Sequence, residues 1–269
     1  MCSRSPLSCW WGEFGNFSNH YGSPGRPVPG QTPQGATGVR LNKFISESGA
    51  CSRRQADRWI EEGRVTLNGR PAVLGAQVEA ADEVCVDGRP VIRQEKHVYL
   101  ALNKPVGITC TSEPDVKENI IDLVGHAERI FPIGRLDKDS DGLILLTNNG
   151  DIVNDILRSE NNHEKEYVVT VDRAITDLSL SMLAGGVRIM GEMTKPCRVV
   201  RTGAQSFRII LTQGLNRQIR RMCSALGYRV QRLQRVRIMH IHLGDLKTGT
   251  WRDLTKAERA GLLEEPVQE

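Results

Sequence analysis

The most informative segment of this sequence is Gly134-Arg135-Leu136-Asp137-Lys138-Asp139-Ser140-Asp141-Gly142-Leu143. It places one arginine and three alternating aspartates between two apolar runs, residues 130–133 and residues 143–146. A carboxylate beside buried apolar elements is costly to desolvate unless a cation or a hydrogen-bond donor pairs with it. We therefore expect each aspartate here to be either a functional group or a capping group.

Three interpretations of these aspartates are open. Their alternation matches the first half of a calcium-binding EF-hand loop, but the twelfth position is Asn148 instead of a glutamate. In a second interpretation, Asp139 or Asp141 caps backbone amides in a turn. In a third, Asp137 is a catalytic nucleophile or base that an arginine holds in place.

A second charged segment, residues 212–222, follows an apolar run and opens a helix that we expect over residues 218–226. Its arginines lie where a helix N-terminus also attracts phosphate. Further arginines surround it in the sequence, namely Arg198, Arg201, Arg208, Arg229, Arg232, Arg235 and Arg237. This density indicates a polyanionic partner, and the alternative is a solvated helix face with a few salt bridges.

Composition sets the broad class of the protein. A chain of 269 residues, 39% of them hydrophobic, can bury a core, which excludes global disorder. Seven scattered cysteines without a C-x-x-C pair, and six histidines without metal spacing, predict neither a disulfide framework nor a metal site. No apolar run approaches the roughly 20 residues of a membrane helix, so we expect a cytoplasmic protein without a membrane partner.

Three segments are predicted to stand outside the folded domains. Residues 1–38 are rich in proline and glycine and show neither structural period, so we expect a disordered leader. Residues 93–97 form a polar linker between a small and a larger domain. Residues 263–269 are expected to be a flexible tail.

Residues 39–92 predict a small domain of two short helices and a small sheet. Ser52 with Gln55 three residues later is a capping-box signature for the second helix, and Asn68-Gly69 is a strong signal for a tight hairpin. The expected helices carry basic residues, arginine more than lysine, which suit phosphate contacts and base stacking: Arg40, Lys43, Arg53, Arg54 and Arg58. We expect this face to bind nucleic acid. Through residues 40–45, 52–57 and 63–69, the segment resembles the S4-type RNA-binding domain.

Residues 98–262 predict an α+β domain with a mixed, largely antiparallel sheet and flanking helices. Strands are expected at residues 98–102, 166–171, 207–211 and 236–241, and a turn at residues 103–107. Strands dominate and do not alternate regularly with helices, which is why a purely parallel arrangement is not expected.

Four segments of this larger domain resemble the pseudouridine synthases that act on ribosomal RNA and carry an N-terminal S4-type domain, the RsuA/RluB/RluE/RluF family. They are residues 102–107, 134–143, 165–169 and 213–222, in that family's order. The details of residues 135–140 and 214–223 look closest to the F branch. Ser140 stands where many relatives have threonine, so that a hydroxyl is retained.

The resemblance implies roles for individual residues. Asp137 matches the catalytic aspartate, Tyr167 the tyrosine that packs on the target base, and Arg220 the arginine that pairs with the aspartate. Arg135 matches the arginine that helps to fill the gap left by the displaced nucleotide. Chemistry on a base within folded RNA requires that base to be flipped out, which an aromatic ring assists by stacking. Arg217 and Arg221 are expected to be further RNA contacts.

The activity implied is isomerisation of a uridine to pseudouridine in large-subunit (23S) ribosomal RNA, without a metal or small-molecule cofactor. Transfer RNA is a candidate second substrate, as in the F branch, and a monomer is the default expectation. The alternative is a non-catalytic RNA-binding factor of ribosome assembly that keeps the fold. The presence of Asp137, Tyr167 and Arg220 favours the enzyme.

Overall fold

The computed structural model describes residues 38–94, 96–113, 115–157 and 162–263. The predicted leader, except for Gly38, and the predicted tail, except for Leu263, lie outside these ranges. The helices are α1 (Leu41–Glu47), α2 (Arg53–Glu61), α3 (Ile120–Val124), α4 (Asp151–Leu157), α5 (Asp177–Gly185), α6 (Gln218–Ala225) and α7 (Lys256–Leu263). Across the described ranges, none of the helices has the length and apolarity needed to cross a lipid bilayer.

The strands pair largely antiparallel, as expected. They are β1 (Val39–Arg40), β2 (Val65–Leu67), β3 (Arg70–Pro71), β4 (Gln77–Val78), β5 (Val84–Val86), β6 (Arg89–Pro90), β7 (Tyr99–Lys104), β8 (Phe131–Ile133), β9 (Asp141–Thr147), β10 (Lys165–Val171), β11 (Arg188–Ile189), β12 (Glu192–Met193), β13 (Arg198–Gly203), β14 (Ser206–Leu211), β15 (Val230–Ile238), β16 (Ile241–His242) and β17 (Trp251–Asp253). The fold is α+β, as predicted.

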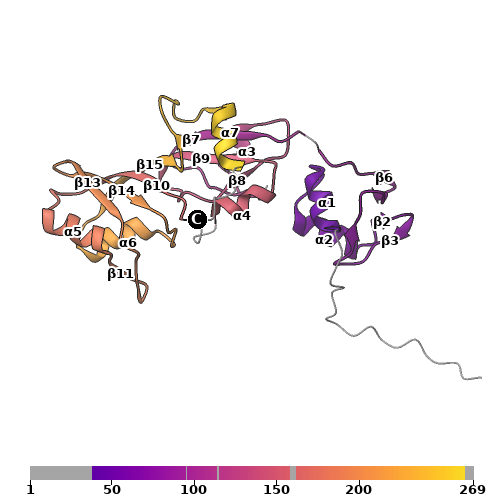
Figure 1. Ribbon diagram of the computed structural model, residues 1–269, viewed down its shortest axis with the longest axis horizontal. Helices are drawn as coiled ribbons and strands as arrows, with labels where there is room; N and C mark the ends of the chain where they lie inside the picture. Colours follow the sequence, from indigo (N-terminus) through magenta and orange to yellow (C-terminus); the bar gives the residue numbers. More distant parts are fainter. Residues whose placement is uncertain (1–37, 95, 114, 158–161, 264–269) are drawn as a thin grey trace, which may run out of the picture. The chain divides into compact units, whose positions relative to one another are not determined.

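The N-terminal part contains α1, α2 and the short strands β1 to β6 (Figure 1). Ser52 caps α2, because its Oγ accepts a hydrogen bond from the Gln55 N–H at 3.2 Å. Asn68 and Gly69 turn the chain between β2 and β3 with φ angles of 52° and 74°, as a type I′ hairpin requires. The predicted helix start and hairpin are therefore confirmed. The apolar core of this part consists of Leu41, Ile45, Cys51, Ala56, Ile60, Val65, Val78 and Val84.

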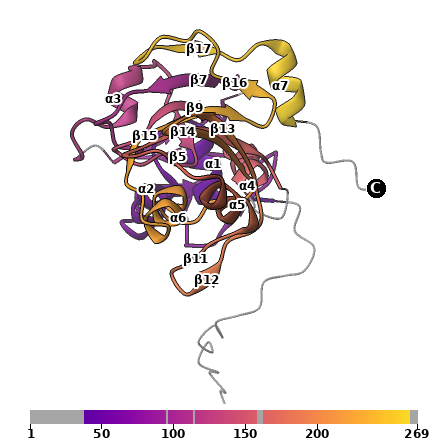
Figure 2. The same ribbon diagram turned by 90° about the vertical axis from the view of Figure 1, so that its left-hand side faces the viewer.

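The larger part is built on a nine-stranded sheet whose main path is β13-β14-β10-β15-β9-β7-β17, with β16 added on β15 and β8 on β9. Strands β15 and β9 run parallel, whereas the other neighbouring strands of this sheet pair antiparallel. Helices α5 and α6 lie beside the β13–β14–β10 half, and α3, α4 and α7 lie around the β9–β7 half (Figures 1 and 2). The predicted mixed, largely antiparallel sheet with flanking helices is confirmed.

Strand β9 is covered on both of its faces. Leu143 and Leu145 belong to one apolar cluster, whereas Ile144 and Leu146 belong to another on the opposite side of the sheet. A strand buried on both faces has no polar side to alternate with, so residues 143–146 form a continuous apolar run in the sequence. This run anchors the segment that begins at Gly134.

The predicted turn at residues 103–107 begins too early. Asn103 and Lys104 are the last two residues of β7, because its antiparallel pairing with β9 continues to Gly142. The Lys104 side chain is fully buried, and its Nζ donates hydrogen bonds to Pro105 O at 2.8 Å and Ile108 O at 2.9 Å. Burial lowers the pKa of Lys104. The buried Lys104 ammonium therefore links two backbone carbonyls of the turn and stabilises it.

The predicted strand at residues 236–241 is wrong at both ends. β15 begins at Val230, because it pairs with β10 over nearly the whole length of that strand. It ends at Ile238, where Met239 turns the chain with a φ of 51° and donates its N–H to Glu164 O at 2.8 Å. A turn inside an apolar run was not visible in the sequence.

Candidate active site

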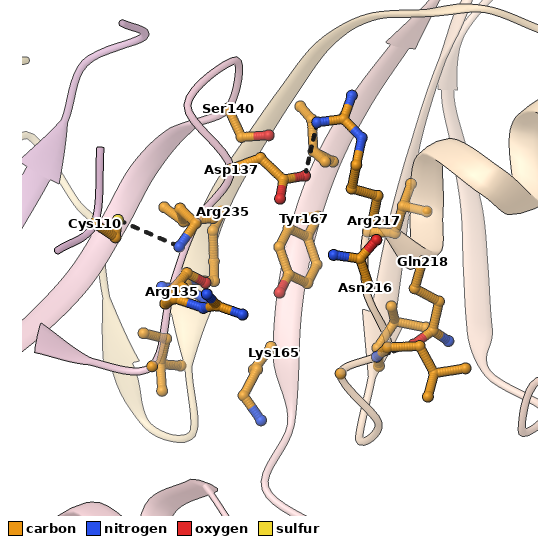
Figure 3. Close-up of a pocket in the computed structure, with 18 of the residues that line it drawn as sticks. Cys110, Arg135, Asp137, Ser140, Lys165, Tyr167, Asn216, Arg217, Gln218 and Arg235 are labelled. Carbon is orange, nitrogen blue, oxygen red and sulfur yellow. Dashed lines mark hydrogen bonds and ion pairs between the residues drawn. The ribbon is translucent and has the colours of Figure 1, made fainter. Parts of the chain in front are cut away.

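A cavity of about 710 Å³ lies where the loop before β9, strand β10 and the segment before α6 meet (Figure 3). Four predicted site residues line it: Arg135, Asp137, Tyr167 and Arg217. So do five residues that the sequence did not single out for the site: Cys110, Lys165, Asn216, Gln218 and Arg235. Side chains from three distant parts of the chain thus face one space.

The loop that carries Asp137 is braced by the turn after β7. The N–H of Gly107 donates to Lys138 O at 2.8 Å, and the buried sulfur of Cys110 accepts the N–H of Leu136 at 3.4 Å. These contacts hold the residues on either side of Asp137. Its carboxylate therefore projects from a supported backbone.

The end of this loop is set by a close approach of two parallel strands. Of the two aspartates that the second interpretation places in a turn, Asp141 is instead the first residue of β9 and pairs with Gln234 of β15. Gly142 next to it has a φ of 105°, and a Cβ there would lie 2.3 Å from Arg235 O. Only glycine fits this approach without a shift of the backbone. Pairing with β15 therefore fixes the residue at which the Asp137 loop ends and β9 begins.

Arg235 also connects the two ends of this loop through hydrogen bonds to backbone carbonyls. Its side chain is buried, and its Nε donates to Leu143 O at 2.7 Å while its Nη1 lies 3.5 Å from Arg135 O. These two carbonyls belong to the two ends of the segment that contains Asp137. Figure 3 shows Arg235 beside Arg135, across the cavity from Arg217. The sequence had indicated Arg235 only as one of several surrounding arginines.

Two arginines from the α6 segment face the aspartates. Arg217 donates hydrogen bonds to both Asp139 carboxylate oxygens, at 3.1 and 2.9 Å, and its Nη1 lies 3.7 Å from Asp137 Oδ2. The Nε of Arg220 lies 4.0 Å from the same Asp137 oxygen. Both distances exceed that of a normal hydrogen bond. Asp137 thus lies close to two positive charges, but neither arginine forms a hydrogen bond with its carboxylate.

Arg220, the predicted partner of Asp137, holds the loop mainly through other atoms. Its Nη2 donates to Asp139 O at 2.7 Å and to Ser140 Oγ at 3.1 Å. The serine hydroxyl noted in the sequence is therefore a contact of Arg220. The hydrogen bonds from Arg217 hold the pKa of Asp139 below its usual range. Asp139 is a turn residue, as predicted, but it also fixes Arg217.

The backbone of Arg217 is in an unfavourable region for an arginine. Arg217 has a φ of 50° and precedes α6 as its N-terminal cap residue, without a capping hydrogen bond from its side chain. A left-handed conformation at a non-glycine residue costs about 1 kcal/mol or more and is concentrated at functional sites. This conformation accompanies the two bonds to Asp139.

Tyr167 lies in the middle of the cavity. Figure 3 shows its ring between Asp137 and Lys165. The ladder between β10 and β15 changes register between Glu166 and Tyr167, and such irregularities redirect side chains near functional sites. The ring is half-buried and packs against two apolar clusters, so its position is well supported.

Lys165 is a further cation of the cavity that the prediction left out. Burial and the neighbouring charge of Arg235 lower the pKa of Lys165, whose Nζ donates to His163 O at 3.2 Å. A signal was present in the sequence, because Lys165 stands two positions before Tyr167 and so shares its face of a strand.

The remaining predicted RNA contacts lie at several places. Arg135 is exposed at the cavity wall. Arg221 is exposed but does not line the cavity, since its guanidinium donates to Asn216 O at 2.9 Å and Asn216 Oδ1 at 3.0 Å. In the N-terminal part, Arg40 precedes α1 and Arg53 and Arg54 open α2, all three exposed.

Lys43, the fourth basic residue predicted in that part, lies on α1. Its Nζ is 3.3 Å from Glu47, one helical turn further on. Lys43 is therefore partly neutralised, unlike Arg53 and Arg54, for which no acidic partner is found in the described part of the chain. The two arginines are the stronger candidates for phosphate contacts.

The alternating aspartates are engaged by arginines. Asp139 pairs with Arg217, and Asp141 Oδ2 accepts a hydrogen bond from Arg232 at 2.9 Å. Among the described residues, no group of three or more histidines, cysteines and carboxylates is placed to hold a metal ion. The arginine partners give these carboxylates a role other than that of a calcium loop.

Comparisons with known proteins agree with this geometry. Residues 98–225 match the family described as RNA pseudouridylate synthase, and residues 39–84 match the S4 domain. The chain is 57% identical over 224 residues to the dual-specificity RNA pseudouridine synthase RluF of Salmonella typhi, which covers 82% of this chain and 78% of that protein.

More distant proteins show the same relationship. The identity to ribosomal large subunit pseudouridine synthase B of Bacillus subtilis (strain 168) is 34% over 228 residues, covering 81% of this chain and 93% of that protein. The crystal structure of a pseudouridylate synthase with 30% identity superposes with a TM-score of 0.63 and covers 84% of this chain and 100% of that one.

Proposed function

Because the chain belongs to the RNA pseudouridine synthases that carry an N-terminal S4 domain, we propose that Asp137 is the nucleophile of this enzyme. The family expected from the sequence motifs is thereby confirmed, and the enzyme converts uridine in RNA to pseudouridine. The roles of individual residues are our proposal, and they rest on the cavity around Asp137 and Tyr167.

The reaction is an isomerisation, so atoms and electrons balance without an oxidant or reductant. The bond between N1 of uracil and C1′ of ribose breaks, the base turns, and a bond forms between C5 and C1′. The proton on C5 leaves, and N1 gains a proton. The Asp137 carboxylate attacks either C1′ or the uracil ring and is released when the new bond has formed.

The neighbouring residues support this role of Asp137. Guanidinium nitrogens of Arg217 and Arg220 lie 3.7 and 4.0 Å from one of its carboxylate oxygens, so the nucleophile stands next to positive charge without a hydrogen bond to it. The Tyr167 ring lies beside it, where it would stack on the flipped uracil and receive the C5 proton. Arg135, exposed at the cavity wall, would fill the space that the flipped nucleotide leaves in the RNA.

For the RNA substrate, we propose large-subunit ribosomal RNA, with transfer RNA as a second one. The names of the relatives support this, since one is a large-subunit synthase and the other a dual-specificity synthase. In vitro modification of 23S ribosomal RNA and of transfer RNA, followed by mapping of pseudouridines, tests the assignment. Modification of small-subunit ribosomal RNA alone would contradict it.

The single observation that carries the proposal is the Asp137 carboxylate beside Tyr167 in one cavity. We expect Asp137→Asn to reduce pseudouridine formation at least about 1,000-fold under single-turnover conditions, with RNA affinity within about threefold of wild type. The matched control is Asp177→Asn, whose carboxylate is exposed and pairs with Arg201 at 2.7 Å. Product formation by Asp137→Asn at the wild-type rate would show that another group is the nucleophile.

A further inference from the structure

We propose that a groove between α6 and the β11–β12 hairpin binds the RNA strand that adjoins the flipped uridine. This inference rests on the proposed function and extends the RNA-binding surface beyond the cavity of Asp137. The groove has a volume of about 560 Å³, and its lining includes Arg188, Ile189, Met190, Arg217, Arg220 and Arg221. Figure 2 shows the β11–β12 hairpin projecting beyond α6.

The groove borders the active-site cavity at Arg217. Arg217 lines both spaces, and it is the arginine that bonds to Asp139 and lies near Asp137. A strand whose uridine is flipped toward Asp137 must leave the cavity in some direction. The side of Arg217 offers it a positively charged path.

Two arginines of the groove donate hydrogen bonds only to uncharged oxygens. Arg188 donates to the backbone oxygen of Gly191 at 3.1 Å, and Arg221 donates to two oxygens of Asn216. Neither forms an ion pair with a carboxylate in the described part of the chain, and no acidic residue lines the groove. An unneutralised pair of guanidinium groups is complementary to a phosphate backbone, which binds such forks through two oxygens at once.

The tip of the hairpin carries an exposed apolar side chain in a strained backbone. Met190 and Gly191 form the two-residue turn between Ile189 and Glu192, with φ angles of 51° and 87°. Asparagine or glycine is favoured at the first position of such a turn, whereas methionine costs about 1 kcal/mol. Met190 is nevertheless 65% exposed, so packing within the chain offsets little of this cost. Contact with a ribose or base face of bound RNA gives it a function.

The salt dependence of RNA binding tests the arginines. We expect Arg188→Ala and Arg221→Ala each to weaken binding of a stem-loop substrate about fivefold and to reduce the slope of log K against log salt by about 0.7 to 1. The matched control is Arg201→Ala, which removes an arginine already paired with Asp177 at 2.7 Å and leaves the slope unchanged. Unchanged slopes in both groove variants would overturn the proposal.

The turn residue gives a test that separates binding from folding. We expect Met190→Asn to raise the melting temperature slightly, because asparagine suits the left-handed turn, and yet to weaken RNA binding about threefold. A loss of affinity in a more stable protein cannot come from unfolding. If Met190→Asn binds RNA as tightly as wild type, the tip does not contact RNA.

A failure of this inference is distinguishable from a failure of the proposed function. With saturating RNA in a single turnover, the Arg188→Ala and Met190→Asn variants are expected to form pseudouridine at the wild-type rate, whereas Asp137→Asn is expected to be at least about 1,000-fold slower. A fall of the saturated rate in Arg188→Ala to the level of Asp137→Asn would overturn the assignment of the groove to binding. So would wild-type RNA affinity in Arg188→Ala.

Discussion

Arg217 donates two hydrogen bonds to the Asp139 carboxylate, at 3.1 and 2.9 Å, while the same guanidinium lies 3.7 Å from Asp137. Asp139 thus holds the arginine that stands nearest to the proposed nucleophile. A fork-shaped guanidinium bound at two oxygens has a fixed direction. The distance between Arg217 and Asp137 therefore depends on Asp139, although Asp139 itself is not proposed to react.

Removing the charge of Asp139 tests this dependence. In Asp139→Asn, Arg217 loses its bidentate partner and is free to move onto the Asp137 carboxylate 3.7 Å away. A closer cation lowers the reactivity of that carboxylate, so we expect the single-turnover rate to fall about tenfold, equivalent to about 1.4 kcal/mol in the barrier. The rate is measured with saturating RNA.

The control for this variant is Asp87→Asn, which breaks a comparable two-bond pair with Arg64 in the N-terminal part, at 2.9 and 2.6 Å. We expect its saturated rate to match wild type. If both variants lose activity equally, the effect of Asp139 is general destabilisation. If neither does, Arg217 does not respond to Asp139.

The exposed arginines at the start of α2 predict a binding effect without a chemical one. We expect the double variant Arg53→Ala, Arg54→Ala to bind RNA about tenfold more weakly and to show a salt slope reduced by about 1.5. Its saturated single-turnover rate should be unchanged. Arg64→Ala is the control, because that guanidinium is committed to Asp87. Equal salt slopes in wild type and the double variant would remove these arginines from the RNA contacts.

The approach of β9 to β15 predicts a large effect of a single methyl group. In Gly142→Ala the new Cβ would lie 2.3 Å from Arg235 O, so the two strands must separate. We expect the free energy of unfolding to fall by about 3 kcal/mol or more, measured by urea denaturation. Gly249→Ala is the control, since its φ of +79° is also positive but nothing lies within 4 Å. It should lose only about 1 kcal/mol.

A pH dependence follows from Glu258 at the start of α7. Hydrogen bonds from Arg252, at 2.8 and 2.7 Å, are the main reason why the pKa of Glu258 is lowered to about 2. A carboxyl with a lowered pKa in the folded state stabilises the protein above its unfolded pKa of 4.5, and this stabilisation is lost as the pH falls toward 2.

We therefore expect Glu258→Gln to unfold with about 2 kcal/mol less free energy than wild type at pH 7. The difference should begin to shrink below about pH 4.5, where the wild-type carboxyl takes up a proton in the unfolded state. Urea unfolding at pH 7, 5 and 3.5 measures it. A difference that stays constant down to pH 3.5 would mean that the ion pair does not stabilise the fold.

Local patterns explain which parts of the fold were predictable. The Ser52 cap and the Asn68-Gly69 hairpin are local arrangements, because the residues that stabilise them are neighbours in the sequence. The end of β7 at Lys104 and the start of β15 at Val230 were not predictable, since each depends on how far a distant strand continues to pair. The periodicity of one segment carries no information about which strand pairs with it or how far that pairing continues.

The sequence by itself determined the family, the α+β class and the identity of Asp137, Tyr167 and Arg220 as candidates, because these lie in contiguous segments with a recognisable order. Only the tertiary structure decided how they are held. Arg217, eighty residues after Asp137, lies 3.7 Å from its carboxylate, whereas Arg220, the partner expected from the sequence, lies 4.0 Å away. Buried Arg235 and Lys104 support the loop by donating hydrogen bonds to backbone carbonyls. Every residue has such a carbonyl, so the sequence does not indicate which ones will accept these bonds.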